Sequence, residues 1–342
     1  MNTLRINLPY VIFLGDIQDS MLAKTGLGLV KWSKDQVVGQ LRLPGCKVDL
    51  GVADLTLQSA VAQGAKSLVL GVATVGGSIS DAWLPVLVQA LESGLDIVNG
   101  LHTDLNKIPA LAAAKAKGGS QIVNVRGAHQ ALPVGTGRKR QGMRILTVGT
   151  DCAVGKKYTA LAMAQCLNAN GIAATFRATG QTGIMIAGEG LAVDSVISDF
   201  VSGAAELISP DNDSGHWDVV EGQGSLFNPS FSAVSMGLLH GSQPDALILC
   251  HDAARLKVST CPTYAIPTLQ ECMDLHLRCA KIVNPSARFI GVSINTSSLP
   301  AAERKAYLDQ LQLELGLPCV DPLVEGCQLF VEQLQQQKTA GM

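Results

Sequence analysis

Aromatic and charged residues are scarce in this sequence. Phe, Trp and Tyr make up 4% of the 342 residues, and Asp, Glu, Lys and Arg make up 16%. Since apolar residues still reach 47%, the core must be built from Ala, Val, Leu and Ile. With 35 glycines, this composition is typical of an α/β enzyme that has many tight turns between strands and helices.

Neither sign of charge is in surplus. Lys and Arg total 26 and Asp and Glu total 28, which leaves a net charge of −2. The chain lacks the basic surplus that drives binding to nucleic acids or membrane surfaces, so we expect only small-molecule substrates. No apolar run approaches the roughly 18 residues that span a bilayer. At about 150 residues per domain, the length indicates two domains and excludes a single small binding module.

The nine cysteines include no CxxC pair. An odd number cannot close completely into disulfides, and the spacings do not match a zinc site, so we expect a reducing, cytoplasmic environment and no metal. The apolar run at 8–15 could pass for a short signal core. No clear cleavage site follows it, and we interpret it as a buried first strand.

The first third of the chain alternates apolar runs with segments of helical spacing. This βαβ pattern predicts a parallel sheet. Residues 133–142 then combine Gly, Pro and charge without periodicity, which is typical of a domain boundary. We therefore predict one α/β domain over 1–135 and a second over 136–342, closed by a Gln-rich helix at 329–338. Expected strands are 11–14, 65–72, 96–99, 121–125, 144–148, 173–176, 217–220, 246–250 and 289–294, and the other expected helices are 82–93, 108–117 and one that ends near 168.

A glycine-containing loop, GTDCAVGK at 149–156, joins an expected strand to an expected helix. Glycines let backbone N–H groups turn inward, the helix N-terminus adds partial positive charge, and Lys156, whose head we expect outside the core, can reach phosphate oxygens. This P-loop departs from the usual pattern, because Lys157 stands where Ser or Thr ligates magnesium. Thr159 lies about 200° further around the helix and points away.

The loop therefore suits a phosphate that is bound and not transferred, as in coenzyme A, with no metal required. The residues expected to hold this ligand are Gly149, Thr150, Asp151, Gly155, Lys156, Lys157, Tyr158 and Thr159.

Further polar residues follow the other expected strands. Glu221 directly follows the expected strand at 217–220, and we expect it to face the loop. It could accept a proton, ligate a metal or cap nearby N–H groups. Asp199 and His251, the latter at the end of a strand, are further candidate bases. Arg177 could fork onto a substrate carboxylate or form an exposed ion pair. The residues expected to bind the second substrate are Arg177, Gln181, Thr182, Gln223, Ser225 and Arg255.

The second domain resembles the P-loop branch that includes dethiobiotin synthetase. Nearly the whole chain resembles a narrower family, long catalogued as a domain of unknown function, the DgcN-type D-glutamate N-acetyltransferases. The motifs are GTDCAVGKKYT (149–159), ATGQTGIMIAGEG (178–190), VEGQGSL (220–226), GVATVGG (71–77) and GLDIVNGLH (94–102). The resemblance implies a Rossmann-like N-terminal domain, a P-loop NTPase-like second domain, and acetyl transfer from acetyl-CoA to the amino group of D-glutamate.

For such an acetyl transfer, we expect Glu221 to take a proton from the amine, with His251 and Asp199 as the next candidates. Arg177 or Arg255 clamps a carboxylate, and loop N–H groups or Lys157 stabilise the oxyanion. Two alternatives stay open: an ATP-dependent ligase with magnesium on Glu221, and a nucleotide-binding switch. We also expect a homo-oligomer.

Overall fold

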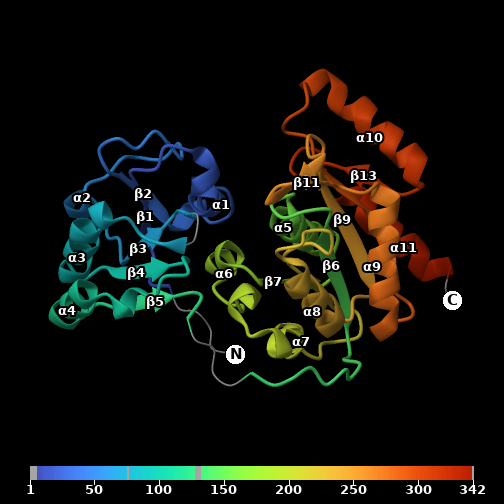
Figure 1. Ribbon diagram of the computed structural model, residues 1–342, viewed down its shortest axis with the longest axis horizontal. Coiled ribbons are helices and arrows are strands. Elements are labelled where there is room, and N and C mark those ends of the chain that lie inside the picture. The colour runs from blue at the N-terminus through green and yellow to red at the C-terminus, as the bar shows by residue number, and fades with distance from the viewer. Residues whose placement is uncertain (1–5, 75–76, 128–131, 341–342) are drawn as a thin grey trace. The chain divides into compact units, whose positions relative to one another are not determined.

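The computed structural model describes residues 6–74, 77–127 and 132–340. They form two compact units, each built around its own parallel sheet (Figure 1), so the prediction of two parallel-sheet α/β domains is confirmed. All nine cysteines are free. Within the described ranges, no helix is both long and apolar enough to cross a bilayer. Val75 and Gly76 of the 71–77 motif lie outside these ranges.

The N-terminal sheet has five strands, all paired in parallel. Its strands are, in pairing order, β2 (Val37–Arg42), β1 (Tyr10–Gly15), β3 (Ser67–Leu70), β4 (Asp96–Asn99) and β5 (Ile122–Asn124). Every residue of β1, β3 and β4 is buried, as expected for a parallel sheet covered on both faces. The sequence did not predict β2, because Gly39 and Gln40 interrupt its apolar run.

The helices of this unit begin and end at local sequence signals. They are α1 (Lys24–Trp32), α2 (Leu57–Ala62), α3 (Leu84–Glu92) and α4 (Pro109–Gly118), with 3-10 turns η1 (Ser20–Ala23), η2 (Lys34–Gln36), η4 (Asp81–Trp83) and η5 (Leu105–Lys107). Thr56 caps α2 in a reciprocal box with Ser59. Pro109 starts α4, and Gly119 ends it in the left-handed conformation.

The second sheet has six parallel strands. In pairing order they are β13 (Cys319–Val320), β12 (Arg288–Asn295), β9 (Ala246–Asp252), β6 (Met143–Gly149), β8 (Trp217–Val220) and β7 (Ala174–Arg177). A hairpin, β10 (Lys257–Val258) with β11 (Cys261–Ala265), follows β9. Since β6 lies between β9 and β8, the loop that follows β6 emerges at the centre of the carboxyl edge.

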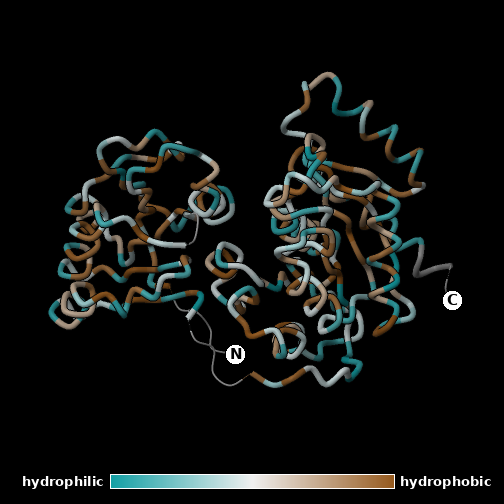
Figure 2. The backbone as a smooth tube through the Cα atoms, viewed as in Figure 1, coloured by the Kyte–Doolittle hydropathy of each residue, from teal (hydrophilic) through white to brown (hydrophobic). Residues whose placement is uncertain are grey.

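Helices cover this sheet. They are α5 (Lys156–Ala169), α7 (Val201–Ile208), α8 (Ser232–Ser242), α9 (Leu269–Val283), α10 (Ala301–Leu315) and α11 (Gln328–Ala340), with η7 (Ser198–Phe200) before α7. Hydrophobic residues gather along the strands (Figure 2). The predicted closing role of α11 is confirmed, because Phe330 is fully buried and a Cβ at Gly291 would lie 2.2 Å from its ring.

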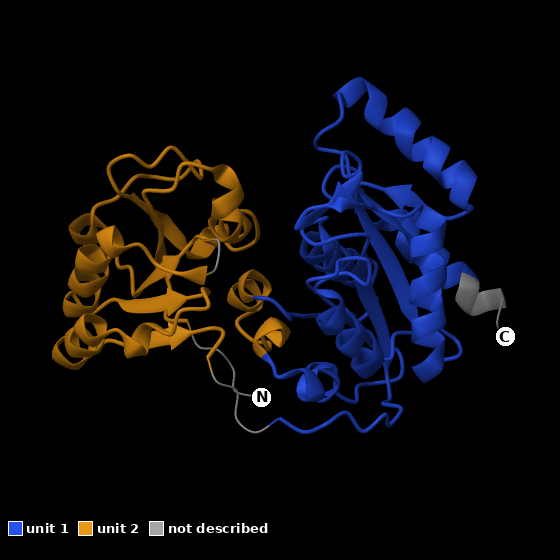
Figure 3. Ribbon diagram, in the orientation of Figure 1, with its two compact units in different colours: residues 1, 131–180, 196–342 blue, residues 2–130, 181–195 orange. Residues whose placement is uncertain are grey.

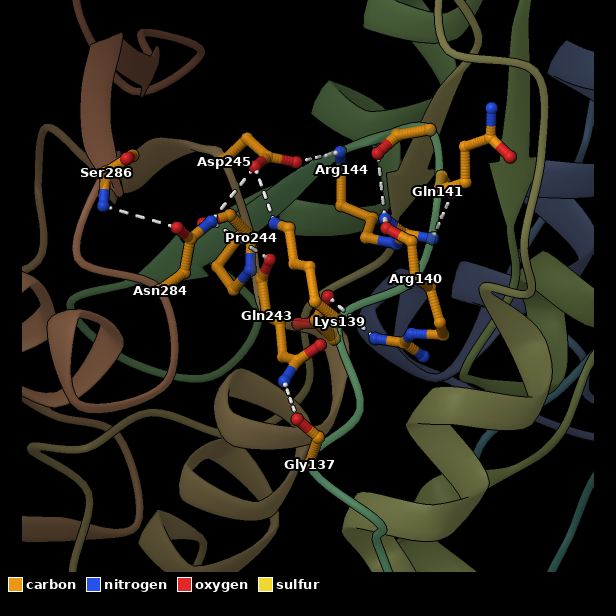
Figure 4. A network of polar contacts seen from close by, with 12 residues as sticks. Gly137, Lys139, Arg140, Gln141, Arg144, Gln243, Pro244, Asp245, Asn284 and Ser286 are labelled. Carbon is orange, nitrogen blue, oxygen red and sulfur yellow. Dashed lines mark hydrogen bonds and ion pairs between the residues drawn. The ribbon is translucent and has the colours of Figure 1, made fainter.

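The segment that precedes β6 is anchored to its unit by a polar network (Figure 4). Asp245 accepts hydrogen bonds from Lys139 Nζ, the Arg144 backbone N–H and Asn284 Nδ2 at 3.0, 2.8 and 3.0 Å. The buried Arg140 guanidinium donates to the carbonyl of Gly241 at 2.6 Å. The aperiodic segment around 133–142 is therefore fixed along the second unit.

The division between the units differs from the predicted domains in one respect. The chain leaves the N-terminal unit between residues 127 and 132, close to the predicted boundary at 135/136. Gln181–Ser195, however, belongs to the N-terminal unit (Figure 3), although it comes from the middle of the predicted second domain. It holds α6 (Gln181–Ala187) and η6 (Val193–Ser195). Local sequence patterns do not show which core a short helix packs on.

Candidate functional site

The loop after β6 is shaped by its glycines. A Cβ at Gly149 would lie 2.9 Å from both Lys156 Nζ and Val154 Cγ2, so glycine leaves room for the lysine to fold back over the strand end. Gly155 has a φ of 111° and leads directly into α5, whose first turn no described side chain caps. The loop and the start of α5 thus present backbone N–H groups, as in a phosphate-binding loop.

Lys156 is nearly buried, which differs from the expectation that its head lies outside the core. It is 7% exposed, and its Nζ donates to the carbonyl of Asp151 at 2.8 Å. Burial lowers the pKa of Lys156, while Cys152, Cys250 and other nearby acidic groups act in the opposite direction. An anion that reaches Nζ would replace the bond to a neutral carbonyl with a stronger bond between two opposite charges.

The next three residues of α5 point to different surroundings. Lys157 Nζ lies 4.4 Å from the centre of the Tyr158 ring, a cation–π distance. Burial raises the pKa of Tyr158. The Thr159 hydroxyl lies 2.7 Å from Ser293 Oγ on β12 and is buried. Thr159 therefore faces the sheet, and its expected place among the residues that hold a ligand is corrected.

Asp151 holds the loop together from inside. Its fully buried carboxylate accepts hydrogen bonds from Asn228 Nδ2, Arg255 Nη1 and the Ser259 backbone N–H, each at 2.8 Å. Burial alone would raise the pKa of Asp151, but the bonds from Asn228, Ser259 and the Cys152 N–H outweigh it and lower the pKa. Asp151 and Arg255, expected to contact ligands, are instead paired with each other, and the bond from the Ser259 N–H joins the loop to the β10–β11 hairpin.

This arrangement predicts how Asp151 affects stability. Because its pKa is lowered in the folded state, its stabilising effect is full above the ordinary carboxyl pKa of about 3.9 and is lost as pH falls through the folded value. Asp151→Asn should cost about 1.5–3 kcal/mol at pH 7. The difference from the natural protein should shrink toward pH 3 in thermal unfolding. Asp252→Asn, on a half-buried neighbouring carboxylate, is the control. Equal melting temperatures for the Asp151 variant and the natural protein would contradict this role.

Glu221, directly after β8, caps backbone groups. It is 3% exposed, and its Oε2 accepts the N–H groups of Thr179 and Gly180 at 3.0 and 3.1 Å. The Thr179 hydroxyl donates to the Glu221 carbonyl at 2.6 Å. The expected capping role is therefore present, and it fixes the turn after β7 to the end of β8. Its charge also reaches Lys156.

The turn after Glu221 packs tightly against the loop. The buried Ser225 hydroxyl donates to the Gly149 carbonyl at 2.8 Å, so Ser225 supports the loop rather than facing solvent. The Gln223 amide, which is half-buried, donates to Thr179 Oγ1 at 3.2 Å. A Cβ at Gly222 would lie 1.7 Å from the Thr147 carbonyl, so the close approach requires glycine.

Arg177 forms an ion pair, one of the two alternatives expected for it. Its Nε donates to Asp218 Oδ1 at 2.7 Å, across the neighbouring strands β7 and β8. The pair is not exposed as expected: the Arg177 and Asp218 side chains are 13% and 1% exposed. A guanidinium held by an internal carboxylate is a poor candidate for clamping a substrate.

His251 lies at the end of β9, as expected, beside the loop. Its Nδ1 is 2.9 Å from Thr150 Oγ1, and both residues are buried. Burial lowers the pKa of His251, with an opposing effect of Asp252, so the imidazole is neutral at pH 7 and able to accept a proton. Of the candidate bases, Glu221 and His251 both adjoin the loop.

The other candidates lie elsewhere. Asp199 is exposed in η7. Gln181 and Thr182 belong to the N-terminal unit, where the Thr182 hydroxyl lies 3.0 Å from Thr25 Oγ1. Sequence reasoning missed Asn228 and Ser259 altogether. Asn228 lies two residues after the 220–226 motif, and this proximity could have identified it. Ser259 lies in the β10–β11 hairpin, whose sequence has no periodic pattern that would predict it.

Comparison with known proteins agrees with this architecture. The description "Domain of unknown function (DUF1611_C) P-loop domain" matches residues 133–331, and "Domain of unknown function (DUF1611_N) Rossmann-like domain" matches residues 41–128. A crystal structure of a DUF1611 family protein from Anabaena variabilis has 32% identity and a TM-score of 0.87, over 96% of this chain and 100% of that one.

Two curated relatives carry the same name, D-glutamate N-acetyltransferase. The protein from Tritonibacter scottomollicae is 49% identical over 96% of this chain and 99% of its own length. The protein from a Pseudoalteromonas species is 42% identical over 97% and 100%. These named acetyltransferases are similar to this chain along nearly their entire length. The chain therefore belongs to the DUF1611 family, in which a Rossmann-like domain precedes a P-loop domain.

Proposed function

We propose that this protein is a D-glutamate N-acetyltransferase that uses acetyl-CoA as the donor. The observation that carries the proposal is the 49% identity to a curated enzyme of that name over 99% of its length. Within this chain, the loop, Glu221 and His251 form a connected group at one sheet edge, which also supports the proposal.

The loop suits the phosphates of coenzyme A. A Cβ at Gly155 would meet no atom within 4 Å, so the backbone there is open to an approaching group. Lys156 would bind a phosphate from the buried side, and the N–H groups at the start of α5 would bind it from the helix end. Lys157 supplies further positive charge in place of a magnesium ligand.

For the chemistry, the proposal assigns the proton transfer to Glu221, with His251 and then Asp199 as the other candidates. The acceptor amine must lose a proton before its nitrogen bonds to the acetyl carbon and the carbon–sulfur bond breaks. Glu221 would take that first proton and release it to solvent, and the second proton, which the nitrogen loses as the amide forms, passes to the leaving sulfur. Lys157, or loop N–H groups that the phosphates do not occupy, would stabilise the oxyanion. Arg177 and Arg255, each held by an internal carboxylate, do not support carboxylate binding.

The test is a product assay with and without metal. Purified protein with acetyl-CoA and D-glutamate should release free CoA thiol and N-acetylglutamate, and EDTA should leave the rate unchanged, because Lys157 replaces the hydroxyl that holds magnesium. ATP with magnesium should yield no phosphate. Acetyl transfer that stops on adding EDTA and recovers with magnesium would contradict the proposal and favour the ATP-dependent ligase. L-Glutamate, run in parallel, tests the chirality of the acceptor.

A further inference from the structure

The segment Gln181–Ser195 is seated on the carboxyl edge of the N-terminal sheet, although its neighbours in sequence belong to the other unit (Figure 3). Gly100, just after β4, marks the seat: a Cβ there would lie 2.8 Å from Met185 Cε and 3.0 Å from Gln181 Cγ. On the other side, Thr25 in the first turn of α1 meets Thr182 at 3.0 Å. The helix α6 thus packs closely against backbone at this edge.

One arginine fastens both ends of the segment. Arg126 follows β5, and its side chain is 9% exposed. Its Nη2 donates to Asp194 Oδ2 at 2.7 Å, and its Nε lies 3.2 Å from both oxygens of that carboxylate. The same guanidinium donates to Gln181 Oε1 and to the Gly100 carbonyl. The first residue of the segment and its next-to-last residue therefore share one rigid cation.

The segment continues directly into the turn that Glu221 holds. Glu221 accepts the N–H groups of Thr179 and Gly180, and the next residue is Gln181, which Arg126 holds. A single peptide bond separates the two attachments. Movement of Gln181 is therefore transmitted to the backbone groups that orient the Glu221 carboxylate.

We propose that Arg126 is a positioning residue for the proton transfer assigned to Glu221. By holding Gln181 and Asp194 together it restrains the turn at 179–181, whose N–H groups orient the Glu221 carboxylate. The kinetic part of this inference rests on the proposed function, whereas the attachment of the segment does not. The phosphate loop makes no use of Arg126, so donor binding is independent of it.

Hydrogen exchange and kinetics test the proposal together. In Arg126→Met, amides of 181–195 should exchange about tenfold faster or more, because both ends of the segment are released. The kcat with D-glutamate should fall about tenfold, as expected when a proton-transfer group is misoriented, while the Kd for acetyl-CoA stays within about twofold. Arg126→Lys, which keeps the charge but loses the fork, should lie between. The matched control is Arg138→Met, which removes an exposed arginine from its 2.5 Å pair with Asp211.

The outcomes separate the two proposals. Unchanged exchange in Arg126→Met would overturn the attachment, and faster exchange with an unchanged kcat would overturn the positioning role. A natural protein that does not acetylate D-glutamate would refute the proposed function, while exchange would still decide the attachment. If Arg126→Met does not fold, Asp194→Asn, which leaves the bonds to Gln181 and Gly100, should show the same pattern at smaller size, and its absence would count equally against the proposal.

Discussion

Turnover of D-glutamate should fall about 100-fold or more in Glu221→Gln, with the Kd for acetyl-CoA nearly unchanged. Glutamine keeps a carbonyl oxygen that can accept the N–H groups of Thr179 and Gly180, so the capping contacts persist. What is lost is the ability to take a proton from the acceptor amine. Part of the activity should return at high pH, where more of the amine is free. Steady-state kinetics from neutral to alkaline pH, with calorimetry for the donor, measure both.

Two further variants complete this experiment. Glu221→Ala removes the capping contacts as well, and should add a loss of thermal stability that Glu221→Gln lacks. His251→Asn removes the other buried candidate beside the loop. If Glu221→Gln turns over at the natural rate while the His251 variant is inactive, the two roles must be exchanged.

Acetyl-CoA should bind about tenfold more weakly or worse in Lys156→Met, because a charge-assisted phosphate contact contributes roughly 1.5–3 kcal/mol. The aliphatic part of the Lys156 side chain packs against Gly222, where an added Cβ would lie 3.0 Å from Lys156 Cδ. Methionine keeps most of this aliphatic part, so it leaves a smaller cavity than alanine would. Since burial disfavours the lysine charge, the melting temperature without ligand should stay equal or rise. Titration calorimetry and thermal unfolding provide the measurements.

Lys157→Met is the comparison for this result. Lys157 is half-buried and stacks on Tyr158, so its removal should weaken donor binding less than removal of Lys156. An unchanged dissociation constant in Lys156→Met would mean that the loop holds a different ligand.

The sequence predicted the parts of the fold that local patterns encode. Apolar runs located β1, β6 and β9 to within two residues, because a strand buried on both faces is predominantly apolar. The strand β2, which holds a buried Gln40, lacked that pattern. The placement of 181–195 could not be predicted, since it depends on contacts with residues as distant as Thr25.

The sequence predicted which sheet edge holds the site, but it did not predict which charged side chains pair with each other there. Glu221, His251 and the loop were expected at one edge from strand order alone. That Arg255 reaches Asp151, and Arg177 reaches Asp218, depends on partners 104 and 41 residues apart in the chain. Without coordinates, a charge beside a crevice can equally face a substrate or another side chain.

The placement of 181–195 also bears on how such proteins can be recombined. The backbone crosses from one unit to the other between residues 127 and 132, at 180/181 and again at 195/196. A chimera that joins the N-terminal domain of one homologue to the second domain of another at a single junction would therefore pair α6 with a foreign Arg126, Gly100 and Thr25. A chimera that keeps the contacts of α6 therefore needs residues 181–195 from the same homologue as the N-terminal domain.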